Sequence, residues 1–294
     1  MEFHDFLHEV LLHGVVDTLK LVPFLFITYL IMEFIEHKVE SVSDRFMRRS
    51  GMVGPLIGSV LGIIPQCGFS STAANLFGSG LITMGTLIAV FLSTSDEMIP
   101  ILLSSSVELI TVVNIVVYKV IVSLIIGFVV DRILKLVASY THPIQIDNFC
   151  EDADCRCEEE NNIWKCSLRH TATITIFVLV VTLLLNMLIF FVGEDSLATI
   201  VQGKPFLSHF ISSIMGLIPN CATSVILSTL YVDGIISVGT MISGLLTGSG
   251  VGLLVLLKIH KHKKENIFIV LTLILVGCIF GIVADIPFVT ALLT

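Results

Sequence analysis

Two short motifs carry the residue types that could bind an ion inside a membrane. One reads Ile-Pro-Gln-Cys at positions 64–67, and the other reads Ile-Pro-Asn-Cys at positions 218–221. Proline has no amide proton and breaks or kinks a helix, so each motif interrupts an apolar run. Carboxamides both donate and accept hydrogen bonds, and thiolates bind soft metal ions. The motifs predict two broken helices whose tips bind a substrate.

We expect substrate-binding residues at both tips and in the helices that leave them. Arriving half-helices present carbonyl groups, which favour cations, whereas departing ones present N–H groups, which favour anions. The sign of the substrate charge therefore stays open. The alternative for the two cysteines is simple packing. The candidate residues are Gln66, Cys67, Ser70, Ser71, Asp96, Glu97, Asn220, Cys221, Thr223 and Ser224.

Three charged side chains lie within apolar runs of the first half. Asp96 and Glu97 follow a Ser-Thr-Ser sequence, and Lys119 lies at the middle of the next run. Charges at membrane depth are costly and point to function, so we assign Lys119 as the charge partner of the site. Carboxylate and amide oxygens suit manganese, whereas thiolates suit softer ions or trivalent arsenic. The alternative is an Asp96–Lys119 ion pair that only joins two helices.

A second group of cysteines lies in the only long polar stretch of the chain. A cytoplasmic location would disfavour disulfides, so four crowded thiols suggest zinc or another soft metal. We expect no other cofactor. The alternative is an acidic linker whose cysteines have no specific role. These possible metal ligands are Cys150, Cys155, Cys157 and Cys166.

The composition predicts that these residues sit in a helical membrane protein. The chain is 55% hydrophobic and 14% charged, with a mean hydropathy of +0.98. Several continuous apolar runs approach the ~20 residues that a spanning helix needs. We expect a multi-pass protein of the plasma membrane, with the lipid bilayer and a small inorganic ion as partners and no nucleic acid. A homodimer is compatible with the sequence.

An internal repeat organises these runs. Shifting the sequence by 154 residues, the difference between Cys67 and Cys221, superimposes Gly58–Glu97 on Ser212–Val251 without a gap. About a third of these positions are identical, among them glycine, proline, cysteine and serine residues. Paired interrupted segments in two halves point to a transporter's binding site.

The loop charges predict that the two repeats are inverted. The loop at 37–50 is rich in lysine and arginine, whereas its equivalent at 191–204 is not; the loop at 258–264 is basic, whereas its equivalent at 104–108 is not. Cationic short loops are cytoplasmic, so each comparison changes sign between the halves. We expect cytoplasmic placement of the linker and extracytoplasmic placement of both termini.

The predicted fold is all-α and polytopic, with two inverted-topology repeats of about five helical segments each. Paired half-helix hairpins are expected to meet near the membrane midplane. The alternative is a long helix kinked at Pro65, with a re-entrant turn at Ser93–Asp96. The predicted division is an interfacial segment (1–13), repeat 1 (14–135), a cytoplasmic Cys-rich acidic linker (136–170) and repeat 2 (171–294).

The paired Pro-amide-Cys motifs, the Ser-Thr-Ser-Asp-Glu sequence and the Cys-rich linker resemble those of the ten-transmembrane heavy-metal exporters. Members of that family are variously described as arsenic efflux proteins or manganese transporters. The resemblance covers most of the chain after the first dozen residues and implies export of a metal or metalloid. It does not fix the substrate.

The leading interpretation is a secondary transporter that exports a divalent metal by alternating access. The second is an exporter of arsenite or another small anion, bound at the half-helix N-termini. A channel and an intramembrane enzyme are further alternatives, but no HExxH or GxSxG motif supports the enzyme. No ATP-binding motif is visible, so we expect coupling to protons, sodium or the membrane potential, or a separate energising subunit.

Overall fold

The computed structural model describes residues 53–63, 67–95, 98–105, 107–136, 163–192, 205–219 and 221–293, with a few scattered residues between 15 and 30. All regular secondary structure in these ranges is helical. Four helical stretches are long and apolar enough to cross a membrane: Met84–Ser104, Leu109–Leu136, Val238–Ile259 and Lys263–Ala284. The predicted class of an all-α polytopic membrane protein is confirmed.

The helices repeat at the offset found in the sequence. The first half contains a helix over 53–61 followed by α4 (Cys67–Gly78), α5 (Met84–Ser93), α6 (Met98–Ser104) and α7 (Leu109–Leu136). A long helix, α9 (Ile163–Val192), begins the second half. It is followed by α11 (Pro205–Gly216), α12 (Cys221–Val232), α13 (Val238–Thr247), α14 (Val251–Ile259), α15 (Lys263–Ala284) and α16 (Pro287–Leu293).

Identical local signals end equivalent helices. At the end of α4, the amide of Leu81 donates to the carbonyl of Leu76 at 2.8 Å, and Gly80 adopts a φ of 74°. The same pattern closes α12, where Gly234 has a φ of 71°. This is the Schellman turn, whose left-handed residue favours glycine. The repeated glycine therefore fixes where both half-helices stop.

Each repeat has two helix breaks, one more than the leading prediction. The first follows the short helices that end at Leu61 and Gly216, just before the two prolines of the tips. The second interrupts the following span, at 94–95 and at 248–250, where a continuous helix is expected. The hairpin at Pro65 and the turn at Ser93–Asp96 were treated as alternatives. The sequence signal for the second break was weak because no proline marks it.

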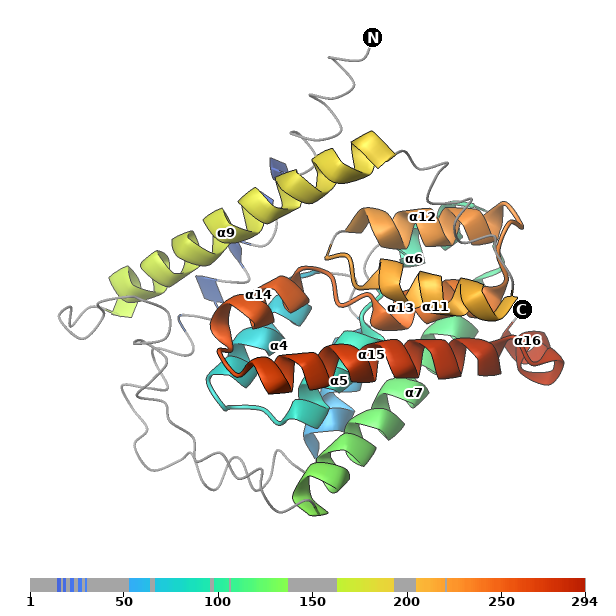
Figure 1. Ribbon diagram of the computed structural model, residues 1–294, viewed down its shortest axis with the longest axis horizontal. Coiled ribbons are helices and arrows are strands. Elements are labelled where there is room, and N and C mark those ends of the chain that lie inside the picture. The colour runs from blue at the N-terminus through green and yellow to red at the C-terminus, as the bar shows by residue number, and fades with distance from the viewer. Residues whose placement is uncertain are drawn as a thin grey trace, which may run out of the picture.

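The broken spans form the centre of the molecule and the unbroken ones its outside. Within an apolar 18-residue stretch of each span, 75% of the α5–α6 stretch and 89% of the α13–α14 stretch are buried, against 33% in α7 and in α15. Figure 1 shows α15 and α7 crossing on the near side of the body, with α9 diagonally across one edge. The exposed faces of α7 and α15 suit lipid contact, since they would be aberrant in water.

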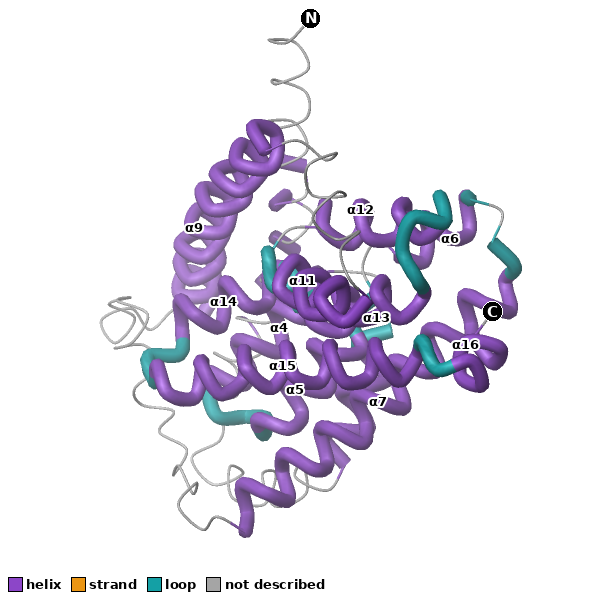
Figure 2. The backbone as a smooth tube through the Cα atoms, turned by 45° about the vertical axis from the view of Figure 1, so that its right-hand side comes forward, coloured by secondary structure: helices purple, strands orange, loops and turns teal. Residues whose placement is uncertain are grey.

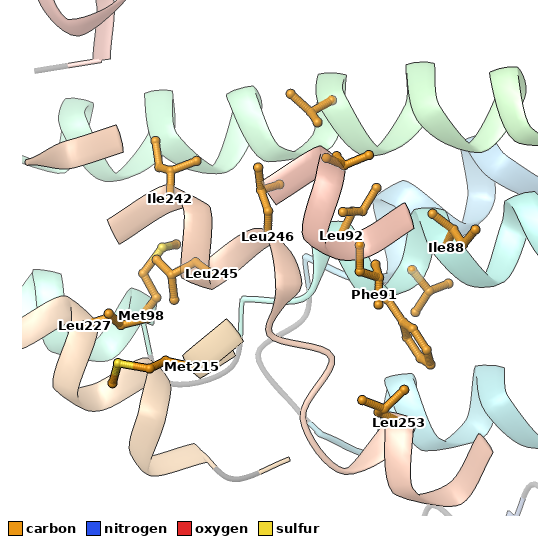
Figure 3. Packing of buried hydrophobic residues seen from close by; sticks show 14 of the residues in the cluster. Ile88, Phe91, Leu92, Met98, Met215, Leu227, Ile242, Leu245, Leu246 and Leu253 are labelled. Carbon is orange, nitrogen blue, oxygen red and sulfur yellow. The ribbon is translucent and has the colours of Figure 1, made fainter. Parts of the chain in front are cut away.

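Figure 3 shows the core that joins the halves. Leu92 of α5 and Leu246 of α13 occupy equivalent positions in the two repeats, and both are fully buried. Phe91 points from α5 toward Leu253 of α14, whereas Met98 of α6 lies beside helices of the second half. The two repeats thus share one hydrophobic core rather than forming separate domains.

The two halves pack reciprocally. α4 of the first half contacts α14 of the second, and α12 of the second contacts α6 of the first. The hydroxyl of Tyr118 donates to the carbonyl of Phe280, and the amide of Asn114 donates to the carbonyl of Leu292. The start of α7 therefore meets the end of α15 and the following α16, and Figure 2 shows α16 beside α7. Reciprocal pairing of this kind is what a two-fold relation between the repeats produces.

An aspartate holds the base of the broken span in each repeat. Asp131 on α7 accepts hydrogen bonds from Thr83 Oγ1 at 2.8 Å and from the amide of Gly85 at 2.9 Å. Asp285, just after α15, accepts from Ser237 Oγ at 2.5 Å and from the amide of Gly239 at 2.7 Å. Both carboxylates satisfy N–H groups that a helix start leaves unpaired.

Candidate functional site

The tips of the two half-helix pairs begin α4 and α12 at equivalent residues. α4 starts at Cys67 and α12 at Cys221, so each cysteine occupies the first turn of a departing half-helix. Gln66 and Asn220 lie outside the described residues, as do the side chains of both cysteines. That the two thiols approach one another therefore stays a prediction.

The predicted serine and threonine residues follow in the first turns of these helices. Ser70 and Ser71 are fully buried in α4, and Thr223 is buried in α12, whereas Ser224 is half-buried. Ser71 Oγ donates to the carbonyl of Gly68 at 2.9 Å. Their burial in apolar helices places hydroxyl groups inside the protein rather than toward lipid, as a substrate pathway requires.

The N-terminal turns of α4 and α14 lie against one another. A Cβ atom added to Gly252 would approach the backbone carbonyl carbon and oxygen of Ser70 to 2.7 Å. In the first half Met98 stands where the second has Gly252, so the equivalent contact cannot be as close. Two helix N-termini side by side add their partial positive charges, which favours an anion.

A buried hydroxyl lies at the second break of the second half. Ser249 is 1% exposed, and its Oγ atom has no hydrogen-bond partner among the described residues. It lies three residues before Gly252, and its equivalent in the first half is Ser95, which donates to the carbonyl of Ser93 at 3.1 Å. A buried polar atom without a partner costs free energy, so such atoms call for an explanation such as ligand contact.

Lys119 joins the second breaks of the two halves. The side chain is fully buried, and its Nζ atom donates to the carbonyl of Thr94, which caps α5, and to that of Leu245 in α13 at 3.0 Å. The amide of Ser249 would normally bond to the Leu245 carbonyl, but it bonds to Thr247 instead. One ammonium group therefore satisfies the ends of both broken helices, where a cation is favoured.

The second repeat has no counterpart of this amine. Leu273 stands at the equivalent position on α15 and is also fully buried. Asp96 and Glu97, the other charges expected in the first half, lie outside the residues that the structure describes. The predicted ion pair between Asp96 and Lys119 is therefore not decided. Lys119 itself lies at the junction of the second breaks.

A buried histidine in the second half was not singled out from the sequence. His209 on α11 is 4% exposed, and its Nε2 atom lies 3.3 Å from Asp285 Oδ2. Its Nδ1 atom lies 3.1 Å from Ser243 Oγ. The equivalent residue in the first repeat is Pro55. The available signal was a titratable side chain within an apolar helix at a position where the two repeats differ.

The linker cysteines are the remaining predicted ligands. Cys150, Cys155 and Cys157 lie outside the described residues, and Cys166 falls in the first turn of α9, with its side chain not described. Within the described ranges, no three histidine, cysteine, aspartate or glutamate side chains come together. The predicted metal site on the linker therefore stays a prediction.

Comparison with known proteins gives a family for the chain. Residues 7–192 and residues 160–293 match the family described as "Putative, 10TM heavy-metal exporter". The two matches together span nearly the whole chain, including both tips, both second breaks and Lys119. No curated protein and no solved structure matches the chain.

Proposed function

Because the chain belongs to the ten-transmembrane heavy-metal exporter family, we propose that it is a secondary-active transporter that exports a divalent heavy metal or a metalloid. The substrate binds where the helix breaks of the two repeats meet. The observation that carries this proposal is the buried Lys119, which joins those breaks. Coupling to an ion gradient and the absence of catalytic activity are parts of the same proposal.

The asymmetry at Lys119 argues for a transport role over a packing role. Leu273 fills the equivalent position in the second repeat without a charge. A scaffold that only had to pack could use leucine twice and avoid burying an ammonium group. Ionisable groups at this depth are expensive and mark ion pathways by default.

The packing supports alternating access. Two of the contacts between the repeats, α4–α14 and α12–α6, each join the tip of one repeat to the second break of the other. A rocking motion of one repeat against the other would open one contact and close the other around a fixed site. We further propose that the linker is cytoplasmic and that both termini are extracytoplasmic, in the plasma membrane.

A divalent cation would be bound mainly by side chains at the breaks. The carboxylate, amide and thiol groups near the breaks are oxygen and sulfur donors, which suit manganese or a softer divalent ion. The carboxylates would also offset the positive charge of Lys119. The ligands that we propose are Gln66, Cys67, Asp96, Glu97, Asn220 and Cys221.

A small oxyanion or arsenite is the second candidate. It is favoured by the contact between the N-termini of α4 and α14 at Ser70 and Gly252. Nearby lies Ser249, whose hydroxyl has no partner in the part of the chain that the structure describes. N–H groups, hydroxyls and an ammonium are the donors that an oxygen-rich substrate needs.

Flux in proteoliposomes with Mn²⁺ and with arsenite as alternative probes tests the proposal. The variant D96N removes one carboxylate charge at nearly constant size. If Mn²⁺ is the substrate and Asp96 a ligand, we expect D96N to lower its flux at least tenfold. If arsenite is carried at the N-termini, its flux should persist in D96N.

The matched control is D233N, which neutralises an exposed carboxylate just after α12. It should transport like the wild type. Saturable flux of neither probe in the wild type would refute the proposal, and unchanged Mn²⁺ flux in D96N would exclude Asp96 as an essential ligand.

A further inference from the structure

The site around His209 differs from its equivalent in the first repeat. Asp131 and Asp285 hold the starts of α5 and α13 in the same way. Only Asp285 also faces a histidine, whose Nε2 atom lies 3.3 Å from Oδ2. In the first repeat Pro55 and Ala89 stand in place of His209 and Ser243. In the first repeat the aspartate only holds the helix start, whereas in the second repeat the equivalent aspartate also faces a titratable side chain.

The hydrogen bonds around His209 need one proton more than a neutral imidazole beside an ionised carboxylate supplies. Ser243 Oγ donates its single proton to the carbonyl of Gly239 at 2.9 Å, so its contact with His209 requires a proton on Nδ1. Nε2 would then oppose the Asp285 carboxylate with a lone pair. A proton between Nε2 and Oδ2 turns that repulsion into a charge-assisted hydrogen bond.

Without that proton the network must rearrange. A neutral imidazole with its proton on Nε2 can donate to Asp285, but Ser243 must then turn its hydroxyl from Gly239 to Nδ1. The two states differ by one proton taken up from water at the imidazole and by the direction of one hydroxyl. No bond other than hydrogen bonds changes, and no other reactant is needed.

We propose that His209 and Asp285 form the proton-binding site of this protein, and that the proton is the ion coupled to export. This rests on the proposed transport function and names its coupling ion. His209 lies on α11, which belongs to the tip of the second repeat, and Asp285 holds α13, which leads to the second break. Proton uptake therefore tightens the attachment of a moving half-helix to the broken span.

Among the residues that the structure describes, few other charges surround the pair. α13 and α16 carry no titratable side chain, and α11 carries His209 alone. α12 contributes Cys221 and Tyr231, and Cys278 of α15 lies with Sγ 3.9 Å from the His209 carbonyl. The charged residues of α15 are at its far end, about 30 Å away for twenty residues of helix. Imidazole is the side chain that proteins most often use to take up and release a proton, so its chemistry suits a proton-binding site.

The first experiment measures proton binding without transport. Purified full-length protein, labelled with ¹⁵N at its histidines, is titrated by NMR in detergent, alongside the variants H209Q and S243A. We expect a titrating signal that is missing in H209Q and whose midpoint moves in S243A, because Ser243 is the Nδ1 acceptor. If the signal lost in H209Q does not titrate in the wild type, the proposal is overturned.

The second experiment measures coupling in proteoliposomes with Mn²⁺ and arsenite as probes. A transmembrane difference of two pH units can drive about a hundredfold accumulation per proton. We expect gradient-driven accumulation in the wild type at least tenfold above the level without a gradient. H209Q and D285N should lower this stimulation below twofold while downhill flux persists.

The control is D131N, which alters the equivalent aspartate of the first repeat, where no histidine stands opposite it. It should retain the stimulation by the gradient. Undiminished stimulation in H209Q would overturn the proton site but leave the transporter proposal intact. Absence of downhill flux in the wild type would instead refute the transport function, while the NMR titration would still decide whether the pair binds a proton.

Discussion

Replacing Lys119 by methionine is the most direct test of the junction between the breaks. The side chain is fully buried and satisfies the carbonyls of Thr94 and Leu245, and methionine matches its length without the charge. Each buried carbonyl left without a donor costs about 1–3 kcal/mol, so the lost bonds cost about 2–6 kcal/mol. Removing the ammonium recovers its desolvation penalty, which is several kcal/mol in a low-dielectric interior.

The lost hydrogen bonds and the recovered desolvation penalty nearly cancel in stability, whereas we expect a large effect on transport. We expect K119M to change the free energy of unfolding by less than about 2 kcal/mol, because replacing buried charges by apolar groups is often neutral. Transport should fall at least tenfold, because the hydrogen bonds that join the end of α5 to α13 through Lys119 are lost. The assays are thermal unfolding in detergent, followed with a thiol-reactive dye, and proteoliposome flux of Mn²⁺ and arsenite.

The matched control is L273M, at the equivalent buried position of the second repeat. A swap of similar volume usually costs under about 1.5 kcal/mol, so both stability and flux should remain close to wild type. Wild-type flux in K119M would refute the assignment of Lys119 to the site. Loss of folding in K119M, with L273M intact, would instead show that its role is structural.

Two further substitutions test the scaffold. Asp131→Ala removes the acceptor for the Thr83 hydroxyl and the Gly85 amide. Hydrogen bonds to charged groups contribute about 1.5–3 kcal/mol each, but removing the carboxylate also removes its desolvation cost. We therefore expect the free energy of unfolding to fall by roughly 2–4 kcal/mol, seen as a lower midpoint in thermal unfolding. Gly252→Ala places a methyl group 2.7 Å from the backbone of Ser70. Overpacking costs about 1–3 kcal/mol of stability. We expect transport to fall more than stability, because this contact joins the two repeats. Wild-type flux in this variant would argue against motion at the α4–α14 contact.

Much of the scaffold was readable because its signals are local. The glycines that end α4 and α12 and the prolines of the tips act within a few residues of themselves. The fixed offset between the halves carried these signals into both repeats, so helix starts such as Cys67 and Cys221 agree with the sequence. Lys119 was recognisable as a functional candidate because a charge in an apolar run is rare.

The second breaks and the histidine pair depended on contacts distant in sequence. The end of α5 at Thr94 has no proline, and its carbonyl is satisfied by a side chain on α7. His209 is recognisable as part of a site only in the folded protein, where α15 ends beside α11 and Asp285 Oδ2 lies 3.3 Å from His209 Nε2. Neither relation has a period or a spacing that a single sequence could display.

By itself, the sequence determined the helical membrane class, the two-fold repetition and the position of the paired tips, because hydropathy, proline and glycine act locally. Tertiary structure alone decided which side chain satisfies which broken helix end. Lys119 bridges Thr94 and Leu245, and Asp285 meets His209, across long separations in the chain. The physical reason is that inside a bilayer every exposed carbonyl and amide must find a partner within the protein, and only the folded packing brings that partner within reach.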